Sequence, residues 1–149
     1  MFLENVTPSL MADYIFPQDM EDLNIRDDYL ETLTIPNGVK CAVVSYLGLR
    51  ELYVPDSMEM LYCSNNKLKK LELPENILIV HVEDNLLQEL TFRGDPKELL
   101  ELDVSNNRLE TLSFIPPKSL HKLVVKYTPL RRLSLAFQRI IFASDDDTF

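Results

Sequence analysis

The sequence of 149 residues is poor in the residue types on which many enzymes and secreted domains depend. It contains no tryptophan, three glycines, two cysteines and two histidines. So few glycines leave no glycine-rich loop that could bind phosphates, and no Cys or His motif has the spacing of a zinc site. No apolar run approaches the roughly 20 residues of a membrane-spanning helix. The start, MFLENVTPSL, has no basic residue before an apolar stretch, so we expect no secretory signal.

What the chain does contain is a repeat of about 20 residues. The template is Φ-x-x-Φ-x-Φ-x-x-N-x-Φ-x-x-Φ-x-Φ, where Φ is apolar, and it starts at Met20, Val39, Met58, Ile77, Leu99 and Leu120. All 36 apolar positions of the six copies, the last being Leu135, are filled by apolar residues. Since 46% of the chain is apolar, chance would fill them all with a probability on the order of 10⁻¹². The repeat predicts a solenoid, in which each unit buries its apolar edge against its neighbours.

The clearest copy, L-x-x-L-x-V-x-x-N-x-L-x-x-L from Leu99, resembles a leucine-rich repeat. Similar copies cover residues 20–135. The copies with Pro36, Pro55 and Pro74 after the last apolar position look like the short repeats of enteric bacterial effectors and of some large DNA viruses. The resemblance implies an α/β solenoid that is predominantly β, with about six short repeats, a parallel sheet on the concave face and protein binding by that face.

Each copy is expected to form one strand and one returning leg. Template positions 3 to 7 form the strand, so positions 4 and 6 point inward and positions 3, 5 and 7 point outward. Positions 11, 14 and 16 lie in the returning leg and close the interior. That leg is too short for a helix, and its prolines lack the donors that a helix interior needs. We therefore predict a convex side that is extended, polyproline-like or short 3₁₀.

Position 9 is asparagine in three copies: Asn66, Asn85 and Asn107. By resemblance these residues form the asparagine ladder of the family, in which buried amides satisfy backbone groups at the turn. The pattern departs at Asp28, Leu47 and Thr128. Asp28 and Thr128 can still bond locally, whereas Leu47 cannot, and the neighbouring Gly48 indicates a rerouted turn.

Both ends of a solenoid need a cover, because the terminal repeats expose their interiors. We expect residues 1–19 to form an N-terminal cap, with a short helix that starts at Thr7-Pro8. Residues 136–149 are expected to combine a cap, formed by Phe137, Ile140 and Ile141, with an acidic tail. The repeats occupy residues 20–135 between these caps.

The outward positions contain the candidate binding site, because packing of the core does not determine which residue types occupy them. In the second to fourth copies they are mostly apolar or aromatic, and we expect one concave patch of Cys41, Val43, Tyr46, Met60, Tyr62, Ile79 and His81. An exposed apolar patch with a polar rim usually marks a contact with another protein. The alternative is that this patch only widens the packing of the sheet or is covered by a terminal segment of the same chain.

No group of residues indicates catalysis. His81 is expected near Glu83, Asp84 and Asp103, but a surface histidine beside acids needs no metal to explain it. Cys63 is predicted to be buried and Cys41 to lack a neighbouring base, so both should be unreactive free thiols. We therefore predict a protein that is not an enzyme, holds no cofactor or metal, and is intracellular, in a cytoplasm, a host cytoplasm or a virion.

The net charge of −9 is unevenly distributed. Residues 1–115 carry 9 basic and 21 acidic side chains, whereas residues 116–140 carry six basic and no acidic ones. A solvated surface with a basic end would explain this pattern. An acidic partner docked on the last two repeats would instead contact Lys118, Lys122, Lys126, Arg131 and Arg132. The acidity of the remaining surface disfavours nucleic acid.

Two functions fit these features. The first is a non-catalytic interaction module that binds a protein partner through the concave sheet. The second is a structural component of a larger assembly, such as a virion or a multi-subunit complex, with its contacts at the ends and in the basic segment.

Overall fold

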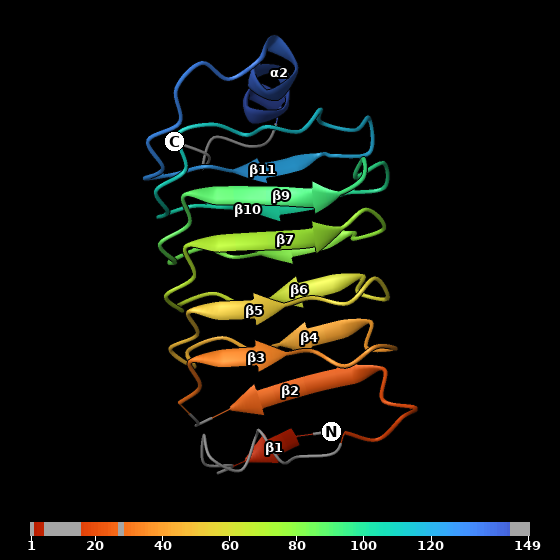
Figure 1. Ribbon diagram of the computed structural model, residues 1–149. Helices are drawn as coiled ribbons and strands as arrows, with labels where there is room; N and C mark the ends of the chain where they lie inside the picture. The colour runs from red at the N-terminus through yellow and green to blue at the C-terminus, as the bar shows by residue number, and fades with distance from the viewer. Residues whose placement is uncertain (1, 5–15, 27–28, 144–149) are drawn as a thin grey trace.

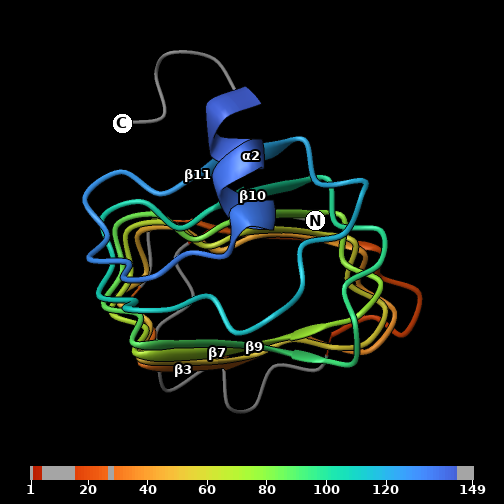
Figure 2. The same cartoon turned by 90° about the horizontal axis from the view of Figure 1, so that it is seen from above.

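The chain forms a predominantly β parallel solenoid of about five turns with repeats of about 19 residues (Figure 1). The computed structural model describes residues 2–4, 16–26 and 29–143. Among the described residues, each of the six copies of the repeat contributes one strand to a front sheet, and residues 2–4 add a seventh. Four of the copies contribute a second strand to the opposite, back side. Front and back strands run in opposite directions across a shared core (Figures 1 and 2).

The front sheet has seven parallel strands in the order β1-β2-β4-β6-β8-β10-β11. Their bounds are β1 Phe2–Glu4, β2 Asp22–Arg26, β4 Cys41–Val43, β6 Met60–Tyr62, β8 Ile79–His81, β10 Glu101–Asp103 and β11 Lys122–Val124. Equivalent template positions lie side by side, as in the row of Leu23, Ala42 and Leu61. The predicted strands are therefore confirmed in all six copies, whereas β1 was not predicted.

The back side is also built of strands, in two separate pairs. Their bounds are β3 Thr32–Thr34, β5 Glu51–Tyr53, β7 Lys70–Pro74 and β9 Glu89–Arg93. β3 pairs with β5, and β7 pairs with β9, both in parallel. The extended returning leg is thus confirmed, while the 3₁₀ alternative is wrong for the described residues. Alternation of buried leucines with exposed polar residues suits strand pairing in these legs.

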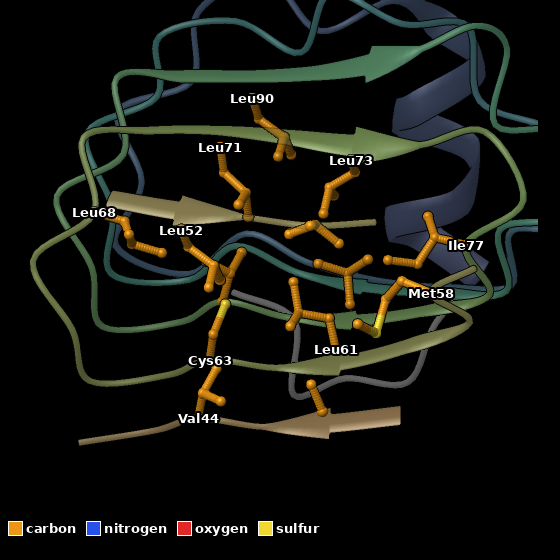
Figure 3. Close-up of a cluster of buried hydrophobic side chains, with 14 of the residues drawn as sticks. Val44, Leu52, Met58, Leu61, Cys63, Leu68, Leu71, Leu73, Ile77 and Leu90 are labelled. Atoms are coloured by element: carbon orange, nitrogen blue, oxygen red, sulfur yellow. The ribbon is translucent and has the colours of Figure 1, made fainter. Parts of the chain in front are cut away.

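The core lies between the two sides, and the side chains that point into it are the predicted ones. Every residue at template positions 1, 4 and 6 is buried. Side chains from the returning legs, such as Leu71 and Leu73, point toward Leu61 and Cys63 of the front sheet (Figure 3). Burial of one such side chain stabilises the fold by roughly 1.5–3 kcal/mol.

One predicted core residue is wrong. Leu135, at the last template position, is 71% exposed because the helix α2 (Leu135–Ala143) begins there. Phe137 of α2 takes the interior place instead, with its ring centroid 5.1 Å from that of Phe114. Phe114 in turn lies 4.8 Å from Phe92, so a column of three aromatic rings continues into the helix.

The helix α2 covers the C-terminal end of the stack (Figures 1 and 2), which confirms a C-terminal cap. Phe137 and Ile141 are buried, and Ile140 packs partly buried against the same core. The helix predicted from Thr7-Pro8 and the acidic tail after Ala143 lie outside the described residues.

The buried asparagines connect neighbouring turns by hydrogen bonds, as predicted for an asparagine ladder. Each amide oxygen accepts a hydrogen bond from position 11 of the preceding turn, at 2.9 to 3.1 Å from the nitrogens of Leu49, Leu68 and Leu87. Each amide nitrogen donates to the position 6 carbonyls of its own and the preceding turn, at 2.9 to 3.2 Å. In the last turn the Thr128 hydroxyl donates to the Val104 carbonyl at 2.8 Å.

The turn of the second copy, where Leu47 replaces the asparagine, is rerouted at Gly48, as expected, whereas Asp28 of the first copy lies outside the described residues. The Leu30 N–H donates to the main-chain carbonyl of Leu47 at 2.8 Å, in place of a side-chain oxygen. Gly48 has φ 81°, and an added Cβ would lie 2.5 Å from the ring of Tyr29. The backbone therefore supplies the acceptor that Leu47 cannot offer, and only glycine fits beside Tyr29.

Candidate functional site

The candidate site is the outer face of the front sheet, where the strand register creates two rows. Cys41, Met60 and Ile79 form one row, because these residues are direct neighbours across β4, β6 and β8. Val43, Tyr62 and His81 form the other. The structure thus brings six of the seven predicted patch residues together, all of them half-buried.

Tyr46, the seventh predicted residue, lies in neither row. It follows the end of β4, with φ 63° and an exposed fraction of 75%. The same left-handed conformation recurs at template position 8 in five turns, at Tyr46, Asn65, Asp84, Asn106 and Tyr127. Position 8 is therefore a turn residue whose backbone bends the chain away from the sheet. Tyr46 thus lies beyond the end of the strand, outside both rows, and its part in the binding patch stays a prediction.

Glu101 is the centre of the polar edge of this face. The Nε2 atom of His81 lies 3.6 Å from one of its carboxylate oxygens, and the Nζ atom of Lys122 lies 3.3 Å from the same oxygen. His121 approaches the other oxygen at 3.9 Å. Burial raises the pKa of the Glu101 carboxyl, but the hydrogen bonds and charges of Lys122 and His81 outweigh it, so its pKa lies below the usual value.

The partner of His81 was not the one expected from the sequence. Asp103 is its neighbour in register, yet the Asp103 carboxylate accepts hydrogen bonds from Ser105. Glu101 lies beside Ile79 in the adjacent row. Both residues occupy template position 3 of neighbouring copies, and this shared position could have placed Glu101 near His81 from the sequence. Among the residues that the structure describes, no group of His, Cys, Asp and Glu could hold a metal ion. The ring of His81 also lies 5.2 Å from that of Tyr62, which joins the acidic edge to the apolar rows.

Both cysteines are free and held as thiols. Cys63 lies fully buried in the core, and this burial raises its pKa. Cys41 is half-buried in the front sheet, where burial and then the charge of Asp22 raise the pKa of its thiol. Since the thiolate is the reactive form, these environments make both side chains poor nucleophiles.

The basic residues near the C-terminus do not share one surface. Lys122 belongs to β11 and pairs with Glu101 on the front sheet. Arg131 lies on the returning leg, where its N–H donates to the Glu110 carbonyl at 2.7 Å, and Arg132 follows it with φ 58°. Lys118 precedes the last strand, and Lys126 follows it. Binding of an acidic partner to these residues stays a prediction.

No helix among the described residues has the length and apolarity needed to cross a membrane. Comparisons with known protein families, characterised proteins and solved structures gave no match. The fold is therefore described from the structure itself: it is a parallel β-solenoid of about five turns with a helical C-terminal cap.

Proposed function

We propose that this chain is a non-catalytic protein of the short leucine-rich-repeat type that binds another protein through its front sheet. The observation that carries the proposal is the pair of apolar and aromatic rows on the outer face of β4, β6 and β8. Outer positions of a sheet are free to be polar, as they are at Asp22 and Asn24 of β2. Packing of the core does not account for Cys, Met, Ile, Val and Tyr at these outward positions, so contact with another protein is the explanation that we propose.

The polar surroundings of the rows indicate what kind of partner fits. Asp22 flanks them on β2, and Glu101 and Asp103 flank them on β10. Protein interfaces commonly have an apolar centre with a polar rim, and complementary charge at the rim favours the right partner. We expect a partner that presents an apolar surface with basic residues at its border.

The two free thiols support an intracellular site of action, because a reducing compartment keeps cysteines unpaired. The low reactivity of both thiols supports a role without catalysis.

The proposal is tested by affinity capture with the intact chain and two variants. Tyr62→Asp places a charge in the centre of the rows and should abolish capture of the partner. Ile115→Asp changes an exposed apolar residue outside the rows and should leave capture unchanged. Thermal melting of both variants would verify that they fold.

Retention of the captured protein by Tyr62→Asp would refute the front sheet as the binding face. If the retained protein forms a stable stoichiometric complex with the chain, the alternative role as a structural component of an assembly is favoured instead.

A further inference from the structure

Glu83 differs from the residues that surround it in its row on the outer face of the front sheet. It lies two residues beyond His81, the last residue of β8, and the alternation of burial along the strand continues through it. The N–H of Asn65 donates to the Glu83 carbonyl at 3.1 Å, so the strand register also extends to this position. The second, third and fifth copies carry a serine at the same template position: Ser45, Ser64 and Ser105. A carboxylate therefore replaces a small hydroxyl side chain on the proposed binding face.

The Glu83 carboxylate has no partner in the part of the chain that the structure describes. Its Oε2 atom is enclosed and accepts no hydrogen bond, and no described cation forms an ion pair with the group. The hydroxyls on either side bond elsewhere, that of Ser64 with Ser45 at 3.3 Å and that of Ser105 with Asp103. An enclosed acceptor without a donor lowers stability, and the loss is larger for a charged group. A serine at position 83, as in the neighbouring copies, would avoid that loss.

The acids around Glu83 make this part of the front face anionic. Asp84 is the next residue along the chain, and Asp103 lies opposite His81 on the adjacent strand β10. None of the three carboxylates forms an ion pair with a described residue. Lys126, a cation at the template position of Glu83, follows β11, and β10 lies between β8 and β11. Negative charge without a paired cation thus lies beside the apolar and aromatic rows, where it favours a cationic group of a partner.

We propose that Glu83 makes the front sheet specific for a partner that carries an arginine beside its apolar contact surface. This inference rests on the function proposed above and narrows it to one contact. Only Oε2 of the carboxylate is enclosed, and Glu83 as a whole is half-buried, so a donor on this face can reach the group. The guanidinium of arginine presents five N–H donors in a planar fork that matches the geometry of carboxylates. Docking supplies the donor that Glu83 lacks in the free protein, so a residue that weakens the fold strengthens the complex.

The first test measures thermal stability of the full chain without a ligand. Glu83→Ser introduces the residue type of the neighbouring copies, and its melting temperature should rise by about 3 °C, because an unpaired carboxylate is removed. Glu110→Ser makes the same change at an exposed glutamate on a returning leg and should shift the melting temperature by about 1 °C or less. A melting temperature of Glu83→Ser at or below that of the control variant would overturn the proposal, because the carboxylate would then not weaken the fold.

The second test measures binding by fluorescence anisotropy, with the full chain and a labelled nine-residue peptide of alternating Arg and Leu. In the control peptide each Arg is replaced by citrulline, which keeps the shape of the side chain but carries no charge. The wild type should bind the arginine peptide about tenfold or more tightly than the citrulline peptide. Glu83→Ser should reduce this preference to about threefold or less, whereas Glu110→Ser, which removes one negative charge outside the front sheet, should keep it.

Tyr62→Ala separates this inference from the function on which it rests. If Tyr62→Ala weakens binding of both peptides while Glu83→Ser leaves the preference for arginine unchanged, the front sheet stays the binding face and the inference is wrong. If Tyr62→Ala changes the affinity for neither peptide, the proposed function fails and the inference fails with it. Absence of saturable binding of the arginine peptide by the wild type, or equal loss of preference in Glu83→Ser and Glu110→Ser, would also overturn the inference.

Discussion

The front and back sides of this solenoid obey the same template but differ in continuity. The front sheet runs unbroken through seven strands, whereas the back side consists of two pairs separated between β5 and β7. Both sides bury their apolar positions, so burial alone does not account for the difference. The front strands are followed by turns in which buried amides connect one copy to the next. Among the described residues, the returning legs have no such series of buried amides. Their strands can therefore bury the same apolar positions without pairing between every two neighbours.

The largest expected effect compares equivalent leucines of the two sides. Leu61→Ala in the front sheet should lower the free energy of unfolding by about 4 kcal/mol, because its side chain is fully enclosed. Leu52→Ala in β5 should cost about 2 kcal/mol, because Leu52 lies beside the break between β5 and β7 and is 7% exposed, so water can fill part of the space. Urea unfolding of both variants measures the difference. Equal losses would show that the break does not loosen the packing of the back side.

A smaller loss is expected from one asparagine that connects the turns. Asn85→Ala removes the acceptor of the Leu68 N–H and the donor to the carbonyls of Cys63 and Val82. We expect a loss of about 2 kcal/mol, because these groups remain buried without partners. Gln88→Ala, an exposed site on the next returning leg, is the control and should change stability by about 0.5 kcal/mol or less. A melting temperature for Asn85→Ala equal to that of the control would contradict the ladder.

The smallest effect is a gain in stability at template position 8. Tyr127 adopts φ 54° with an exposed side chain, in a conformation that costs most residues energy but suits asparagine. Tyr127→Asn should raise the free energy of unfolding by about 1 kcal/mol or less. The matched change Tyr53→Asn, in the extended strand β5, should give no gain, because asparagine is depleted in strands. Calorimetric melting of both variants distinguishes a backbone effect from a general effect of removing tyrosine.

Much of the fold could be predicted because it depends on local alternation. The positions of Leu61 and Cys63 follow from spacing alone, and so do the two rows that contain Met60 and Tyr62. Leu135 satisfied the template, yet the chain turns into a helix there and Phe137 fills the interior. The place of Tyr46 in the turn after β4 was less evident, because an aromatic residue at a turn looks, in sequence, the same as one on a strand.

The break between β5 and β7 could not be predicted, because the residues on both sides of it fit the template equally well. Leu52 and Leu71 occupy the same position in adjacent copies, and both are buried. Pairing between their strands depends on how closely two returning legs approach, which is a property of the stacked turns. For the same reason the contact of Arg93 with Val54, 39 positions apart, has no local signal.

The sequence by itself determined which side chains face inward and which face outward, because alternation along a strand is a property of neighbouring residues. The tertiary structure alone decided which returning legs pair and which acid contacts His81. These outcomes depend on contacts between turns about 20 residues apart or more, and the spacing between turns is set only when the whole stack has formed.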